Sequence, residues 1–303
     1  MSQVSAHIVS LSTDTPVARL CRVLGVCRSA FYEWKKGRTH VLGEKKQTVA
    51  QRVKEVFDAH KSRYGARRIA AELVALGVQA GRCQVSSRMR EQGLKALQPR
   101  SFVPKTTQTD PMLQRSPNLL MGMSTVDRPN QVWVGDITYL PLAGGSWAYL
   151  ATWMDLFSRA IVGYKVSDSM DASIVADSLG KAVGQRCPAP GLIVHSDGGG
   201  QYMDKGFRKY LKDNLFKQSM TRVENHYDNA FAESLFSRFK AELLGGRAFE
   251  GLAAAKQETF EHIEAYYNRT RRHSSIGYLS PEEFEKTWHQ APTGPGTKLN
   301  LPS

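Results

Sequence analysis

Residues 131–140 read QVWVGDITYL, and residues 192–201 read LIVHSDGGGQ. Each stretch has an apolar run typical of a buried β-strand, with Asp136 inside the first run and Asp197 directly after the second. Because a carboxylate is a poor strand former, an aspartate in such a strand indicates a specific role. The glycines at 198–200 let the backbone approach a phosphate closely. The simpler alternatives are a surface-facing strand aspartate and an Asp-Gly turn with no ligand.

A third acidic residue, Glu233, follows in the stretch YDNAFAESLFSRFKAEL, which has the apolar spacing of a helix. Sixty residues separate Asp136 from Asp197, and thirty-five separate Asp197 from Glu233. Carboxylates brought together from two strands and a helix make a site for hard divalent cations, and two such ions can hold the attacking and leaving oxygens of a phosphodiester in line. We expect two Mg²⁺ ions, or Mn²⁺, with Asp136 bridging both, Asp197 holding one and Glu233 the other. This chemistry requires no catalytic Ser or Tyr.

Other acidic residues compete for these positions. Glu224 lies in a polar stretch before the helix, and Glu242 lies nine positions past Glu233 on a rotated face. Asp155 is able to face the same side of the sheet as the first aspartate, but we favour a strand-end ion pair with Arg159. Glu233 therefore remains the preferred third carboxylate.

The three carboxylates fall in residues 131–290, which alternate between strand and helix patterns. The predicted strands are 132–140, 147–156, 160–165 and 191–196, and the predicted helices are 171–184, 202–213, 228–243 and 251–268. Gly144 and Gly145 give a hairpin signal between the first two strands. Early strands followed by alternating helices and a further strand predict an α/β fold. Residues 291–303 predict a flexible tail.

The net charge of +13 lies entirely in the first part of the chain. Residues 1–130 hold 22 Lys and Arg against 9 Asp and Glu, whereas residues 131–303 hold 19 of each. A basic segment attracts phosphate backbones, so we interpret it as binding nucleic acid rather than as a soluble basic surface with no partner. The sequence has no run of eighteen apolar residues, no secretory signal and no metal-binding cysteine pattern, which indicates a cytoplasmic protein without a membrane partner.

Two helix-turn-helix patterns lie in this basic segment. Residues 16–37, within an all-helical region over 1–62, place apolar stripes on either side of Gly25, and a second module over 63–96 repeats the pattern. The alternative is helical hairpins that pack only on their neighbours. Residues 97–130 predict a linker. The candidate DNA contacts of the two units are Arg28, Ser29, Lys35, Arg67, Arg68, Arg82, Gln84 and Arg88.

Basic residues near and after the third carboxylate are further candidates for DNA contact. Lys240 lies seven positions, or two helical turns, after Glu233, and Arg238 is a weaker candidate. Arg271 and Arg272 lie in the string AYYNRTRRHSSIGYLSPEEF, which combines basic and aromatic residues. The alternatives are a solvated lysine that pairs with a neighbouring glutamate, and cations matched to the dipole of a helix C-terminus.

The strings QVWVGDITYL, HSDGGGQY, NAFAESLFSRFKAE and YNRTRRHSSIGYLSPEEF, in this order and with this carboxylate spacing, resemble the DDE transposases and retroviral integrases. The resemblance is strongest to the OrfB-type transposases of the insertion-sequence-three group and runs from about Val17 to Phe284. It implies a ribonuclease-H-like integrase core preceded by helix-turn-helix modules. The family more often has a basic or polar residue where Gly198 stands, a departure that affects DNA contacts but leaves the carboxylate intact.

The resemblance implies that the chain nicks the ends of an insertion sequence and joins their 3′-hydroxyls to DNA, with terminal inverted repeats and target DNA as partners. In the family, the basic residue at the position of Lys240 contacts terminal DNA. The resemblance also implies a homo-oligomer that pairs two ends, a protein from an upstream reading frame as partner, and a place on the bacterial nucleoid.

Three other hypotheses compete with a transposase: a DNA-binding regulator, a nuclease that cuts without joining, and an inactive transposase relic. A regulator gives no reason for three spaced carboxylates. The family strings in the core argue against a simple nuclease, and the complete set of carboxylates argues against a relic.

Overall fold

The computed structural model describes residues 2–13, 15–36, 44–98, 115–121, 123, 125–221 and 230–290. Its largest unit is built on a mixed sheet with the strand order β3-β2-β1-β4-β5. The neighbours among β1, β2 and β3 pair antiparallel, whereas β4 runs parallel to both β1 and β5. The strands are β1 (Val132–Pro141), β2 (Trp147–Asp155), β3 (Ile161–Ser167), β4 (Ile193–Ser196) and β5 (Lys217–Met220). The predicted α/β class is confirmed.

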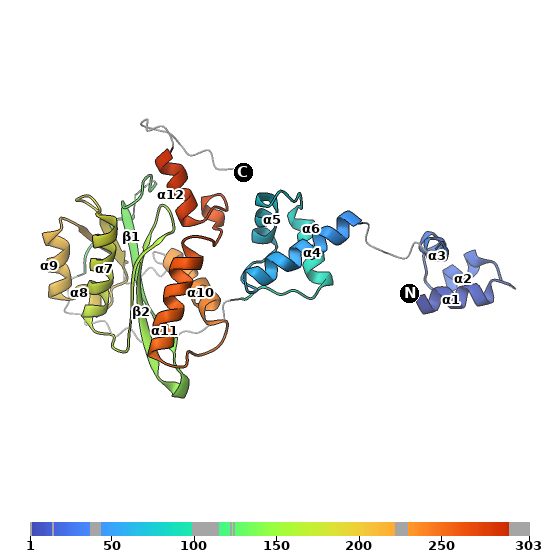
Figure 1. Ribbon diagram of the computed structural model, residues 1–303, viewed down its shortest axis with the longest axis horizontal. Helices are drawn as coiled ribbons and strands as arrows, with labels where there is room; N and C mark the ends of the chain where they lie inside the picture. The colour runs from blue at the N-terminus through green and yellow to red at the C-terminus, as the bar shows by residue number, and fades with distance from the viewer. Residues whose placement is uncertain are drawn as a thin grey trace.

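Helices cover both faces of this sheet (Figure 1). Successive side chains of a strand point to opposite faces, so Trp133 and Trp153 fill one core while Leu140 and Leu150 fill the other. One face is covered by α7 (Ala172–Arg186), α8 (Gly200–Met203) and α9 (Lys205–Asp213). The other is covered by α10 (Ala230–Leu244), α11 (Leu252–Phe260) and the π-helical segment Glu261–Tyr267 that continues it. A 3₁₀ turn (Ser274–Ile276) leads to α12 (Pro281–Gln290).

A helical unit precedes the sheet and consists of α4 (Glu44–Ala59), α5 (Ala66–Ala75) and α6 (Arg82–Glu91). Val53, Ile69 and Val85 come from the three helices and are fully buried in one core. The predicted boundary at residue 62 therefore separates α4 from the helices on which it packs. Leu76, the first residue after α5, is 59% exposed.

The N-terminal residues form a separate small unit of α1 (Ser2–Leu11), α2 (Val17–Val23) and α3 (Arg28–Lys35). Ile8, Cys21 and Phe31 are its buried core. The turn between α2 and α3 contains Gly25 with φ 66°, as the helix-turn-helix pattern requires. Helix α1 falls in the region predicted as helical, although its bounds were not predicted, and its Ile8 packs in the core with Cys21 and Phe31 of the two predicted helices.

Several elements of the sheet unit differ from the predictions. Strand β5 was not predicted. The predicted helix over 202–213 is two helices, because Asp204 ends α8 and caps α9 by accepting the N–H groups of Gly206 and Phe207. The second half of the predicted linker packs on the core, where Leu120, Met123 and Val126 contact buried residues. In the part of the chain that the structure describes, no helix is long and apolar enough to cross a membrane.

Candidate active site

Asp136 lies in β1, and Asp197 lies directly after the neighbouring parallel strand β4. In the pairing of β1 with β4, Val134 is opposite His195, and each aspartate follows one of these two residues by two positions. Side chains two positions apart along a strand share a face, so Asp136 falls on the face of Val134. The charges of both aspartates raise the pKa of Tyr202, so the two predicted site residues lie near one side chain.

Helix α10 covers this face. Its residue Phe236 packs with Val132 and Val134 of β1. Glu233 lies three residues before Phe236, within one turn of the helix, and its side chain is outside the described part of the chain. The helix that carries the predicted third carboxylate therefore lies on the same face of the sheet as Asp136.

The charges of both aspartates affect the pKa of one buried tyrosine hydroxyl, that of Tyr202. Tyr202 of α8 is 2% exposed, and burial raises its pKa well above the ordinary value, with the charges of Asp197 and Asp136 raising it further. Burial also raises the pKa of the Asp197 carboxyl. Two contributions oppose this shift: the N–H of Gly199, which donates to Oδ1 at 3.0 Å, and the charge of Arg115. The two aspartates thus share one partly desolvated site.

The donors at this point suit a hard divalent cation. Carboxylate oxygens are the ligands that Mg²⁺ prefers, and a cation stabilises carboxylates that have lost their water. Thr152 is the cross-strand neighbour of Asp136, and its buried hydroxyl has no hydrogen-bond partner among the described residues. No three metal-ligating side chains of the described residues form a complete site. The side chain of Glu233 lies outside these residues.

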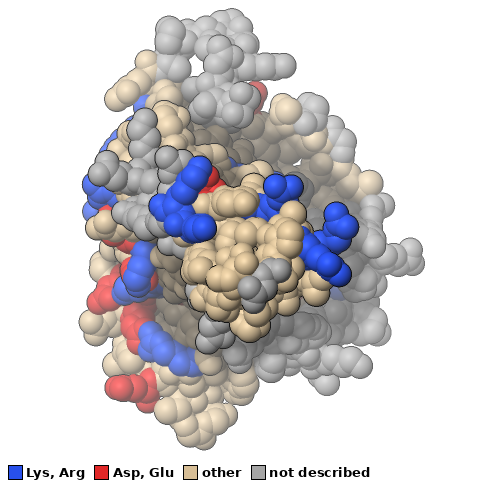
Figure 2. Space-filling view, turned by 90° about the vertical axis from the view of Figure 1, so that its right-hand side faces the viewer, with Lys and Arg blue, Asp and Glu red and all other residues tan. Residues whose placement is uncertain are grey.

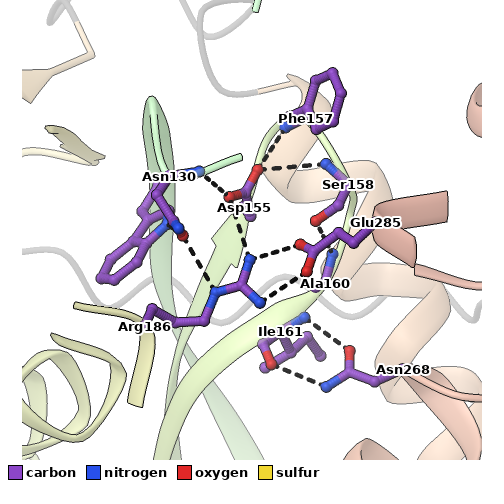
Figure 3. A network of polar contacts seen from close by, with 10 residues as sticks. Asn130, Asp155, Phe157, Ser158, Ala160, Ile161, Arg186, Asn268 and Glu285 are labelled. Atoms are coloured by element: carbon purple, nitrogen blue, oxygen red, sulfur yellow. Dashed lines mark hydrogen bonds and ion pairs between the residues drawn. The ribbon is translucent and has the colours of Figure 1, made fainter. Parts of the chain in front are cut away.

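Asp155, a competing carboxylate, has a structural role. It is fully buried and lies opposite Trp133, three residues from the cross-strand partner of Asp136. Its carboxylate accepts three backbone N–H groups (Figure 3), from Asn130 at 2.6 Å, Phe157 at 2.8 Å and Ser158 at 3.3 Å. These bonds fix the turn between β2 and β3.

Two arginines lie near Asp155. We expected Arg159 as its partner, and the charge of Asp155 opposes the lowering of the Arg159 pKa by burial. Nη2 of Arg186 also lies 4.0 Å from Oδ2 of Asp155. Nη1 and Nη2 of Arg186 also donate to Oε2 and Oε1 of Glu285 in α12, at 2.8 and 2.6 Å (Figure 3). Arg186 reaches this position because it is the last residue of α7, from which it bridges the sheet to α12.

Glu242, the second competitor, is held by arginines. It is 6% exposed and accepts two hydrogen bonds from Arg271, at 2.6 and 2.8 Å, and one from Arg68 at 3.2 Å. Burial alone raises its pKa, but the bond and charge of Arg271 and the charge of Arg68 lower it overall. These contacts leave Glu242 no role at the aspartate pair. Glu224 lies outside the described residues.

Comparison with known proteins places the chain in a family. The integrase core domain matches residues 126–226 and 215–281, and an HTH-like domain matches residues 44–102. The transposase for insertion sequence element IS904 of Lactococcus lactis is 40% identical over 241 residues, 80% of this chain and 94% of that protein. Transposase InsF for insertion sequence IS3A of Escherichia coli is 39% identical over 271 residues, 89% of this chain and 93% of that protein.

The chain belongs to the insertion-sequence transposases of the IS3 group. This finding confirms the predicted family, its function in DNA transposition and its class as a polynucleotidyl transferase.

The chain is also similar to solved integrases. One is a simian T-cell lymphotropic virus intasome bound to PP2A regulatory subunit B56 gamma (16% identity, 77% of this chain and 76% of that chain, TM-score 0.45). Another is the HTLV-2 integrase catalytic core domain with magnesium (15% identity, 53% and 99%, TM-score 0.40).

Several predicted DNA-contact residues of the transposase are exposed. Arg67 lies on α5, and Arg82 and Gln84 lie in the first turn of α6. Arg28 and Ser29 begin α3 in the N-terminal unit. Figure 2 looks onto the end of the molecule formed by the N-terminal unit and shows Lys and Arg side chains around this unit.

Two further candidates lie on α10. Arg238 is exposed. Lys240 is half-buried, and burial lowers its pKa. Lys240 lies four residues after Phe236, which packs on β1, so it is one turn further along the helix that covers the aspartates.

Four arginines predicted to contact DNA form ion pairs within the folded transposase. Arg271 is 2% exposed, so its position leaves no surface for DNA. Within the string RTRRHSS only Arg271 and His273 are buried, and the helical unit docks beside them: the Tyr64 hydroxyl accepts the N–H of Arg272 at 2.7 Å. The basic and aromatic residues of this string therefore build an interface between units. The four pairs are Arg68 with Glu242, Arg88 with Glu91, Arg271 with Glu242 and Arg272 with Glu72.

Two residues at the aspartate pair were not predicted. Tyr202 lies five positions after Asp197, and a tyrosine soon after an acidic strand end was the only signal in the sequence. Arg115 had no signal, because its proximity to Asp197 depends on how the predicted linker packs on the sheet.

Proposed function

We propose that the transposase cuts and joins DNA at the ends of its insertion sequence with Asp136, Asp197 and Glu233 as a carboxylate triad. The observation that supports this proposal is the parallel pairing of β1, which contains Asp136, with β4, which ends directly before Asp197. Helix α10, which carries Glu233, covers the same face through Phe236. Membership of the transposase family supports the role of the third residue.

The proposed reaction is an in-line transesterification. An oxygen of water or of a DNA 3′-hydroxyl forms a bond to phosphorus while the bond from phosphorus to the leaving oxygen breaks. Asp136 would hold two Mg²⁺ ions, Asp197 one of them and Glu233 the other; Mn²⁺ offers the same ligand preference. When bound, such ions lower the pKa of the attacking hydroxyl and neutralise the charge of the leaving oxygen. The paired strands hold the two aspartates in place before DNA arrives, and no side chain becomes attached to DNA.

We propose three groups of DNA contacts. Lys240 and Arg238 on α10 are close in sequence to the third carboxylate and would bind terminal DNA near the reacting phosphate. The exposed start of α6, with Arg82 and Gln84, would enter the major groove, and Arg67 would contact the backbone. Arg28 and Ser29 would give the N-terminal unit a similar contact.

The proposed reaction also determines how many subunits and which partners must come together. Because two ends of the element must be joined to one target, we propose a homo-oligomer that pairs the terminal inverted repeats. A DNA-binding protein from an upstream reading frame would work with it or be fused to it. Action on chromosomal DNA would place the enzyme on the bacterial nucleoid.

The test is strand joining with a labelled duplex that carries the element's own end, in Mg²⁺, with binding of the same duplex measured in parallel. We expect joined product from the wild type and none from Asp136→Asn, with binding within about twofold because the variant keeps its basic surfaces. Asp168→Asn, which changes an exposed aspartate just after β3, is the matched control and should join normally. Equal joining by Asp136→Asn would overturn the triad. Binding without joining by the wild type would favour a regulator.

A further inference from the structure

Arg115 lies against the glycine that follows Asp197. A Cβ atom added to Gly198 would lie 2.5 and 2.6 Å from the two terminal nitrogens of Arg115 and closer still to its Cζ. Real Cβ atoms do not approach other atoms so closely, so the guanidinium occupies the space that a side chain at position 198 would take. Arg115 and Gly198 are therefore a steric pair beside a proposed catalytic carboxylate.

The chain around Arg115 is fixed to the edge of the sheet. The Ser116 hydroxyl donates to Oε1 of Gln218 at 2.7 Å, and the N–H of Met220 donates to the carbonyl of Pro117 at 3.3 Å. The N–H of Leu119 donates to the hydroxyl of Ser219 at 2.9 Å. These bonds place the segment beside β5. The position of Arg115 thus depends on contacts with the catalytic core.

The position of the guanidinium has an electrostatic consequence. The charge of Arg115 lowers the pKa of the Asp197 carboxyl, in opposition to burial, so the two groups lie within electrostatic reach of each other. A site of several carboxylates repels the phosphodiester that it must bind. An arginine relieves this repulsion, and its planar fork of N–H donors matches the oxygens of a phosphate.

We propose that Arg115 is a phosphate-binding residue of the active site. We further propose that Gly198 lacks a side chain so that the guanidinium of Arg115 can reach this site. The proposal rests on the proposed function, because it assigns to Arg115 a DNA phosphate at the Asp197 side of the triad. It also links the two parts of the enzyme. Arg115 lies in the segment between the helical DNA-binding unit and the sheet, so that segment supplies part of the site.

Three single variants and two controls test the proposal in the full-length transposase. Arg115→Ala removes the charge, and Arg115→Lys keeps a charge without the fork. Gly198→Ala pushes the guanidinium away and leaves the charge in the protein, whereas Gly184→Ala, in α7, is its control because the space beside Gly184 is open. Arg128→Ala controls for the loss of a cation from the same region, since Arg128 is exposed and pairs only with the neighbouring Asp127 in the described structure.

The measurements are the rate of joining of the element's end duplex and the salt dependence of its binding. Arg115→Ala should slow joining about 10- to 100-fold and reduce the slope of log affinity against log salt by about 1, as expected for one lost phosphate contact. Arg115→Lys should keep the slope and recover part of the rate. Gly198→Ala should resemble Arg115→Ala, and the double variant should be no worse than either single one, because both remove the same contact.

Unchanged joining and an unchanged salt slope in Arg115→Ala would overturn the proposal while leaving the transposase activity intact. Losses that simply add in the double variant would also overturn it, because Arg115 would then not act through the space beside Gly198. If the wild type binds the duplex and does not join it, the proposed function fails, and the salt slopes still decide whether Arg115 binds a phosphate.

Discussion

Arg271 and Glu242 form a two-point ion pair that is buried between α10 and the C-terminal part of the core. Nε of Arg271 lies 2.6 Å from Oε2 of Glu242, and Nη2 lies 2.8 Å from Oε1. Arg68 of α5 reaches the same carboxylate, and Nε of Arg63 donates to the Glu242 carbonyl at 3.1 Å. One glutamate thus ties together the helix that carries Glu233, the string RTRRHSS and the helical DNA-binding unit.

Replacement of Glu242 should therefore destabilise the protein strongly. Glu242→Gln leaves two buried arginines without their counter-charge, and breaking a buried pair in this way costs about 3–5 kcal/mol of unfolding free energy. Urea unfolding at pH 7 measures this cost. Glu250→Gln, at an exposed position, is the control and should change stability by less than about 0.5 kcal/mol. Similar values for the two variants would show that the buried pair does not stabilise the fold.

The buried histidines should make stability depend on pH. His262 is 4% exposed, and burial, with the charge of Arg63 next in size, lowers its pKa to about 3. Burial also lowers the pKa values of His60 and His273. Between about pH 6.5 and the lowered value, the unfolded chain binds a proton at each histidine that the folded chain does not bind, so stability falls as pH falls.

Measurement of unfolding free energy at pH 7.5 and pH 5.5 tests this prediction. His262→Leu removes one titrating group, so its loss of stability between these pH values should be smaller than that of the wild type by about 1.4 kcal/mol. His289→Gln, at an exposed position of α12, should keep the wild-type dependence. An identical dependence in His262→Leu and the wild type would contradict a neutral, buried His262.

Gly135 should be intolerant of a side chain because of its cross-strand neighbour. Trp153 is opposite it in β2, and a Cβ on Gly135 would lie 2.5 and 2.6 Å from two ring carbons. The ring is held by a bond from Nε1 to the Ser178 hydroxyl at 3.0 Å. Gly135→Ala should therefore cost about 1–3 kcal/mol and disturb the strand next to Asp136.

The matched control is Gly184→Ala, in α7, where no atom lies near the added carbon. Alanine is a better helix former than glycine, so this variant should gain up to about 1 kcal/mol. Thermal unfolding of both variants provides the comparison. A gain of stability in Gly135→Ala would mean that Trp153 moves without cost.

The strands with the two aspartates could be predicted because their residues are locally informative. Runs such as VWV before Asp136 and IVHS before Asp197 have few alternatives to a buried strand. Strand β5 could not be predicted, because Lys217 to Met220 have no apolar run and form a strand by pairing with β4. This pairing is a tertiary effect that overrides the local preference.

The same distinction holds in the site. The aspartates could be found from their spacing and from the strands that carry them. The burial of Arg271 could not, because its partner Glu242 lies on another helix and the two meet only in the fold. The contact of Arg115 with Gly198 likewise depends on how a segment without periodicity packs along β5. Sequence patterns predicted residues whose roles are local, and failed where charges are paired over long distances.

The central claim is that Glu233 completes the site formed by Asp136 and Asp197. The most direct test is single-turnover strand joining in Mg²⁺ by Glu233→Gln, with Glu250→Gln as the matched control. The account predicts that Glu233→Gln binds the end duplex as the wild type does and gives no joined product, while the control joins at the wild-type rate. Joining by Glu233→Gln at the wild-type rate would contradict it, and because Glu242 is held by Arg271, the third ligand would then have to be sought at Glu224.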